Sequence, residues 1–189
     1  LSVNSAQEGI IGTLRPNGFQ WSETKGLEVT DVNSNFDQNG VEVYYHGDTN
    51  GFVYTHDVGH SFDGTNINAI YETPDYDYGD FGTLKTLHYI KISITPEGTV
   101  QPTLTVKFDF GNLDVPQPDS ILLDSVPAPA TFSNAIFGQA IFGAAEQPLV
   151  RESLVGSGHS NNFRFSSNDS NAPYIVNGFY VDYIPSGRR

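Results

Sequence analysis

Three closely spaced aspartates in one short polar segment are the clearest candidates for cation chemistry. Asp75, Asp77 and Asp80 lie together with Gly79. Carboxylate oxygens at alternating positions are typical of the start of a calcium-binding loop. The complete EF-hand pattern is absent, because Gly79 takes the fifth position and Thr86, rather than a glutamate, takes the twelfth. A solvated acidic loop is therefore the favoured interpretation, and a cation site is the alternative.

Two tyrosines alternate with these aspartates, and they are candidates for stacking on a sugar. Tyr76 and Tyr78 could form an aromatic platform for a glycan. Aromatic residues near strands more often belong to the core or pack against cross-strand neighbours. A carbohydrate-binding or adhesion module is accordingly the alternative function that these residues suggest.

Three histidines lie close in sequence, at His46, His56 and His60. Zinc requires three or four converging ligands. His56 and His60 flank a turn instead of sharing one helix face, so the pattern favours ordinary polar histidines. We expect no metal and no cofactor.

A serine lies beside a histidine in the run Gly156-Ser157-Gly158-His159-Ser160. A nucleophile elbow needs Gly-x-Ser-x-Gly between a strand and a helix, and this run has neither that spacing nor a helical pattern after it. A turn between strands explains it better. A carboxylate pair for sugar hydrolysis requires only proximity in space, and no pair is distinguished among the 22 acidic residues. We therefore expect no catalytic residues, with a hydrolase as a third hypothesis.

Composition narrows the function classes. The 189 residues include 22 acidic and 9 basic side chains, a formal charge of −13. Binding to nucleic-acid phosphates depends on clustered Lys and Arg, so a DNA-gripping role is excluded, although an acidic wall lets DNA slide past. Without cysteine there are no disulfides. No run approaches the roughly 18 apolar residues of a membrane span. Because the chain contains no Met, we expect it to be a processed or partial product.

The elements that must position these residues are short strands joined by turns. Frequent Gly, Pro, Phe and Tyr predict an all-β protein. Residues 27–36 predict a short strand followed by a polar loop at 33–35. Residues 41–57 predict a hairpin, because Asn50-Gly51 is a strong turn dipeptide. A strand is also expected at 67–72.

Two longer segments alternate more regularly. In 84–95, Leu87, Tyr89, Lys91 and Ser93 would share one face, and His88, Ile90, Ile92 and Ile94 the other. In 103–110, Leu104, Val106, Phe108 and Phe110 would share a face. With the turn at 96–98 between them, these segments form the best two-stranded signal in the chain.

The remaining chain predicts strands at 149–155, 162–167 and 174–184. The Gly- and Phe-rich segment 132–145 predicts an extended buried connection or a short helix. A change of composition near Gly64 suggests a domain boundary. Regular strand and turn spacing favours a sandwich, barrel or propeller element.

Residues 41–64 contain an expected strand followed by two motifs, Gly-Asp-x-x-Gly-x-Val-Tyr at 47–54 and Gly-x-x-Phe-Asp-Gly at 59–64. This pattern resembles the last propeller blade of the tail nozzle proteins of short-tailed bacteriophages, also called tail tubular protein B. The segments 70–94 and 154–189 are similar to the strand that leaves that propeller and to the β-rich C-terminal part of the same family. The resemblance covers roughly residues 36–189, and full nozzle subunits are much larger.

The resemblance implies a C-terminal portion of a virion tail protein. Residues 1–64 would be a partial propeller blade, and residues 65–189 a β-sandwich-like domain. It also implies a homo-hexameric ring that contacts the tail adaptor ring and other tail proteins. DNA would pass through this ring without specific binding, and no reaction would be catalysed.

Overall fold

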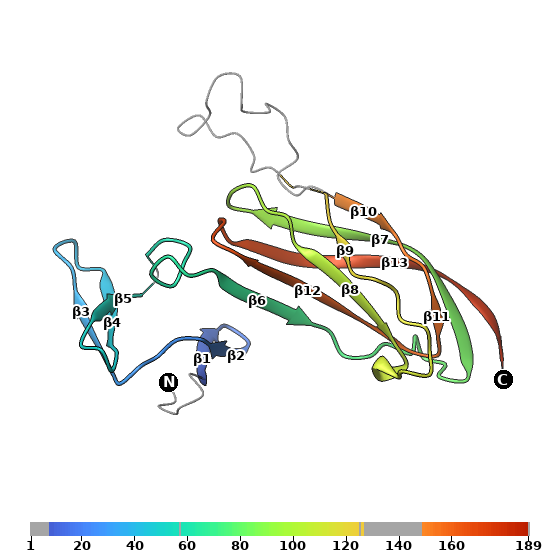
Figure 1. The fold of residues 1–189 in the computed structure, drawn as a ribbon, viewed down its shortest axis with the longest axis horizontal. Coiled ribbons are helices and arrows are strands. Elements are labelled where there is room, and N and C mark those ends of the chain that lie inside the picture. The colour runs from blue at the N-terminus through green and yellow to red at the C-terminus, as the bar shows by residue number, and fades with distance from the viewer. Residues whose placement is uncertain (1–7, 57, 125, 127–148, 189) are drawn as a thin grey trace, which may run out of the picture. The chain divides into compact units, whose positions relative to one another are not determined.

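The chain folds into two compact units that divide between Phe62 and Asp63. A computed structural model describes residues 8–56, 58–124, 126 and 149–188, and Figure 1 shows them as a ribbon. Apart from one short 3-10 helix, every regular element among these residues is a β-strand. The predicted all-β class is therefore confirmed. The segment 132–145 lies outside the described residues.

The first unit contains two small antiparallel sheets. Strands β1 (Glu8–Arg15) and β2 (Gly18–Lys25) form a hairpin, and β3 (Asp31–Phe36), β4 (Glu42–Gly47) and β5 (Val53–Thr55) form a three-stranded sheet in that order. The polar loop expected at 33–35 is wrong, since these residues pair with Val43–Tyr45 inside the sheet. Cross-strand pairing on this exposed sheet tolerates polar side chains on β3.

The turn between β4 and β5 is organised by Asp48. Its Oδ1 accepts hydrogen bonds from the backbone N–H groups of Asn50 and Phe52, at 2.9 and 2.8 Å. Gly51 supplies the positive φ that closes the turn. The predicted hairpin is thus present, with its turn held by a carboxylate.

The second unit is a sandwich of two antiparallel sheets. In the first sheet, β7 (Thr83–Pro96) lies between β13 (Tyr174–Arg188) and two short strands, β10 (Leu149–Ser153) and β11 (Ser157–Gly158). The second sheet has the order β6 (Ile67–Glu72), β12 (Asn161–Asp169), β8 (Thr103–Phe108) and β9 (Ile121–Leu122). We call them the β7 sheet and the β12 sheet. Strands were expected at 149–155, 162–167 and 174–184, and all three lie in this unit.

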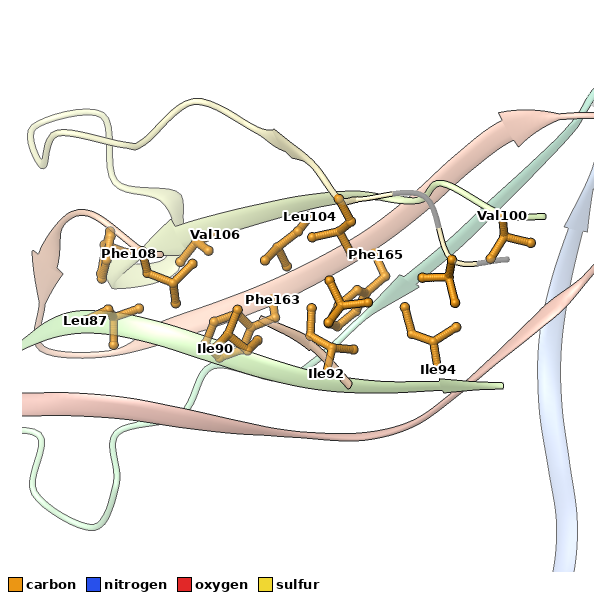
Figure 2. Packing of buried hydrophobic residues seen from close by; sticks show 14 residues of the cluster. Leu87, Ile90, Ile92, Ile94, Val100, Leu104, Val106, Phe108, Phe163 and Phe165 are labelled. Carbon is orange, nitrogen blue, oxygen red and sulfur yellow. The ribbon is translucent and has the colours of Figure 1, made fainter. Parts of the chain in front are cut away.

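One hydrophobic core lies between the sheets, as Figure 2 shows. Ile90, Ile92 and Ile94 project from β7 toward Phe163 and Phe165 of β12, and all five are at most 1% exposed. Burying each such side chain contributes about 1.5–3 kcal/mol. The other buried members of the core are Leu87, Val100, Leu104, Val106, Phe108, Leu123, Val126, Val150 and Leu154.

The prediction that residues 84–95 and 103–110 pair as two neighbouring strands is wrong. Strands β7 and β8 alternate as expected but belong to different sheets, and they face each other across the core. Two amphipathic strands joined by a turn can bury their apolar faces either side by side or face to face, and their sequence pattern is the same in both cases.

Two local deviations change which residues face the core. In β7, Asp182 pairs with Tyr89 and Tyr183 pairs with Leu87, so His88 is an extra, bulged residue. Leu87 therefore joins the buried face and His88 is exposed, the reverse of the prediction. Phe110 is also misassigned, since it lies in the 3-10 helix η1 (Asp109–Gly111) with φ of 60° and is 70% exposed.

Within the part of the chain that the structure describes, no helix has the length and hydropathy that a bilayer crossing requires.

Candidate functional site

The three aspartates lie in the loop between β6 and β7, but each carboxylate has a separate structural partner. Asp77 accepts the N–H of Gly79 at 2.9 Å. Asp80 accepts the N–H of Gly82 and the hydroxyl of Thr83. These two carboxylates therefore stabilise local turns of the loop.

Asp75 joins three loops at one end of the sandwich. Its carboxylate accepts hydrogen bonds from the Phe110 N–H at 3.2 Å, the Ser160 hydroxyl at 3.3 Å and the Asn162 amide at 3.3 Å. A second carboxylate, Asp109, accepts the N–H groups of His159 and Ser160 at 2.7 and 2.9 Å. Charge-assisted hydrogen bonds of this kind are stronger than neutral ones. Asp75 and Asp109 therefore hold the β6–β7 loop, η1 and the β11–β12 loop in their conformations.

The same end of the sandwich contains a buried lysine. Lys85 is 3% exposed, and its ammonium group donates to the backbone carbonyls of Asp80 and His159, the latter at 2.7 Å. It therefore ties the β6–β7 loop to the loop between β11 and β12. Sequence reasoning missed this residue, because a lysine in an alternating strand is normally assigned to the solvent face.

The two candidate glycan-binding tyrosines pack against β13. The Tyr78 ring lies 4.4 Å from that of Tyr183, and the Tyr76 ring lies 6.3 Å from that of Phe179. Burial raises the pKa of Tyr78 above its ordinary value of 10.0. These contacts cover the edge of the core near β13, and only Tyr76 is exposed, at 36%.

The serine and histidine of the 156–160 run do not form a nucleophile pair. Ser157 shares a hydrogen bond with Thr86 at 2.7 Å. Ser160 is 2% exposed and donates to Asp75, while the His159 ring lies beside Phe81. A nucleophile requires an adjacent base and access for a substrate, and neither serine has both.

The structure brings two of the three candidate histidines together in the first unit. Nδ1 of His46 lies 2.8 Å from Nε2 of His56, and the His46 ring stacks on Tyr54 at 5.1 Å. Burial, followed by the proximity of His56, lowers the pKa of His46 from its ordinary value of 6.5. His60 is exposed and lies in the turn after β5. This pairing follows from the register of β4, so the sequence spacing alone did not reveal it.

Taken together, these groups anchor loops, and the described residues include no cluster of three or more side chains that could hold a metal ion. Comparisons with protein-family models and with curated proteins found no match.

Proposed function

We propose that this chain is a structural subunit of an oligomeric assembly, the C-terminal portion of a tail nozzle in a short-tailed bacteriophage. The proposed assembly is a ring of identical copies beneath the tail adaptor, through which the genome leaves the virion. The single observation that carries the structural role is the exposed apolar face of the β1–β2 hairpin.

That face consists of four side chains on the same side of two strands, with Glu23 at its edge. The register pairs Ile10 with Glu23 and Leu14 with Phe19, and Trp21 lies over Gly12 between them. The Phe19 and Trp21 rings stack at 5.6 Å. The exposed fractions of the four apolar side chains, Ile10, Leu14, Phe19 and Trp21, run from 57% to 72%.

A two-stranded hairpin is marginally stable in water, and a large exposed apolar patch normally marks an interaction surface. Covering the patch removes these side chains from water at about 25 cal/mol per Å² of apolar area. An assembly of copies would provide that cover. The formal charge of −13 suits a channel wall that repels DNA phosphates.

The specific assignment to a tail nozzle is supported by the resemblance of residues 41–64. In that segment the turn depends on the carboxylate of Asp48 and the positive φ of Gly51, which are both part of the resembling pattern. These residues therefore have a structural reason for their types.

Trp21 is the only tryptophan in the chain, so its fluorescence reports directly on the hairpin. On self-association we expect its emission maximum to shift to shorter wavelength as the protein concentration rises. Trp21→Ser should weaken association in sedimentation velocity, while Gln20→Ser, on the opposite face, should not. A chain that stays monomeric with an unshifted Trp21 at all concentrations would refute the structural role. Electron microscopy of particles should place the chain in a ring around DNA.

A further inference from the structure

The outer face of the β7 sheet carries a cluster of aromatic and cationic side chains that the core does not use. The guanidinium carbon of Arg151 lies 4.4 Å from the ring centroid of Tyr89, and the Lys91 ammonium lies 5.7 Å from it. The Tyr180 ring lies 6.4 Å from the Tyr89 ring and is 59% exposed. The register places Arg151, Lys91 and Tyr180 side by side across three strands. We call these four residues the Tyr–Arg face.

Among the residues that the structure describes, neither cation of this face has a carboxylate partner, although the chain is strongly acidic. Lys107, by contrast, pairs with Glu72 at 2.8 Å. Asp182 is a nearby carboxylate on β13, because the register pairs it with Tyr89. Among the described residues, however, neither Lys91 nor Arg151 forms an ion pair with it or with any other carboxylate. Arginine and tyrosine are enriched at the centres of protein interfaces. Within the described ranges, the face therefore offers two positive charges outside any ion pair, and two aromatic rings, to an acidic partner.

A segment of the same unit has the complementary chemistry. Residues 112–120 lead from η1 toward β9, and we call them the acidic loop. Leu113 at its tip is 95% exposed, and Asp114 and Asp119 are exposed beside it. Neither carboxylate is paired with a cation within the described ranges.

The acidic loop is held in shape by one side chain. The Gln117 amide accepts the Phe108 N–H at 2.8 Å and donates to the carbonyls of Phe108, Asn112 and Val115 at 2.9 to 3.1 Å. Asn112 also accepts the Asp114 N–H at 3.0 Å. A loop already ordered in this way loses less conformational freedom when it binds. Its exposed leucine is thus presented as an anchor.

We propose that the acidic loop of one copy docks on the Tyr–Arg face of the next, with Asp114 and Asp119 near Lys91 and Arg151 and Leu113 against the aromatic rings. The face belongs to the β7 sheet, while the loop joins strands of the β12 sheet. Each copy therefore inserts its acidic loop into one neighbour and receives, on its Tyr–Arg face, the acidic loop of another. Such a head-to-tail contact builds a ring when its rotation closes. This inference rests on the proposed function, since it names the contact that would join the copies.

Charge exchange in the full chain tests the contact. The face variant carries Lys91→Glu and Arg151→Glu, and the loop variant carries Asp114→Lys and Asp119→Lys. Each alone should weaken self-association by about tenfold or more in sedimentation velocity. An equimolar mixture of the face and loop variants should regain self-association, and so should a chain with all four substitutions. In both cases every acidic side chain at the contact again meets a basic one.

The matched control changes two exposed acids elsewhere, Asp63→Lys and Glu97→Lys, and should associate like the unmodified chain. Circular dichroism establishes that each variant is folded. Rising salt should weaken the unmodified assembly, because exposed charge pairs are screened.

The failures of the two proposals are distinguishable. If the face and loop variants associate normally with a shifted Trp21 emission, the inference is wrong and the structural role stands. The inference also fails if the mixture does not regain association, or if the face variant loses only binding to alginate, a polyuronic acid, which would make the face a glycan platform. A monomeric unmodified chain overturns both proposals.

Discussion

Replacing Gly158 by alanine should destabilise the second unit through one steric conflict. Gly158 lies in β11 against the ring of Phe108, a core residue that is 1% exposed. A Cβ built at Gly158 would lie 2.7 Å from Cδ1 and 2.9 Å from Cβ of Phe108, and 3.0 Å from the carbonyl oxygen of Ser160. Gly156 lies against the same ring. The added methyl group therefore has no room unless Phe108 and the backbone at Ser160 both shift.

The expected cost follows from these distances. Carbon atoms are in optimal contact at about 3.5–4.0 Å, so the new methyl group would overlap Phe108 by roughly 0.6 Å or more. Forcing extra volume into a packed core typically costs about 1–3 kcal/mol. We therefore expect Gly158→Ala to lower the free energy of unfolding by about 2 kcal/mol.

Urea unfolding followed by far-UV circular dichroism measures the change, and amide hydrogen exchange in β8 and β12 assigns it to the second unit. Gly178→Ala is the matched control, since no heavy atom lies within 4 Å of a Cβ at that position. This control should change the free energy of unfolding by no more than about 0.5 kcal/mol.

The steric reasoning also predicts a coupling. In a Phe108→Leu background the contact with the ring is gone, while the contacts with Cβ at position 108 and with the Ser160 carbonyl remain, so the cost of Gly158→Ala should fall in part. Equal unfolding midpoints for the two glycine variants, or an undiminished cost in the leucine background, would refute the steric explanation.

Three further predictions concern single contacts. Thr73→Val removes the hydroxyl that accepts the buried Phe163 N–H at 3.0 Å and should cost about 1–3 kcal/mol of unfolding free energy in urea titrations. Asn177→Ala removes the side-chain bonds to β7 at 2.8 and 3.3 Å and should cost about 0.5–1.5 kcal/mol by the same measurement. Because the pKa of His46 is lowered on folding, the unfolded chain binds protons more readily, so the first unit should lose stability as pH falls below about 6.5. Urea unfolding at several pH values, followed through the amide NMR signals of β4 and β5, checks this, and His56→Gln should reduce the loss.

The sequence by itself determined the class of structure and many of the strands. Alternation from Tyr89 to Thr95 correctly separated the buried isoleucines from the exposed side, because the period of a strand is a property of its own residues. The turn at Asn50-Gly51 was likewise determined locally, since its backbone conformation depends on residues within the turn.

Tertiary structure decided which strands pair and which residues meet. Strands β7 and β8 could have formed a hairpin, but burying their apolar faces against each other placed them in opposite sheets. The bulge at His88 follows from the pairing of β7 with β13, and the conformation of η1 follows from the bonds that Asp109 makes with distant N–H groups. The contact between His46 and His56 depends on β-sheet register in the same way. The β7–β13 pairing and the bonds of Asp109 join residues far apart in the chain, so their energies enter only when distant strands meet, whereas His46 and His56 meet when β4 pairs with its neighbour β5.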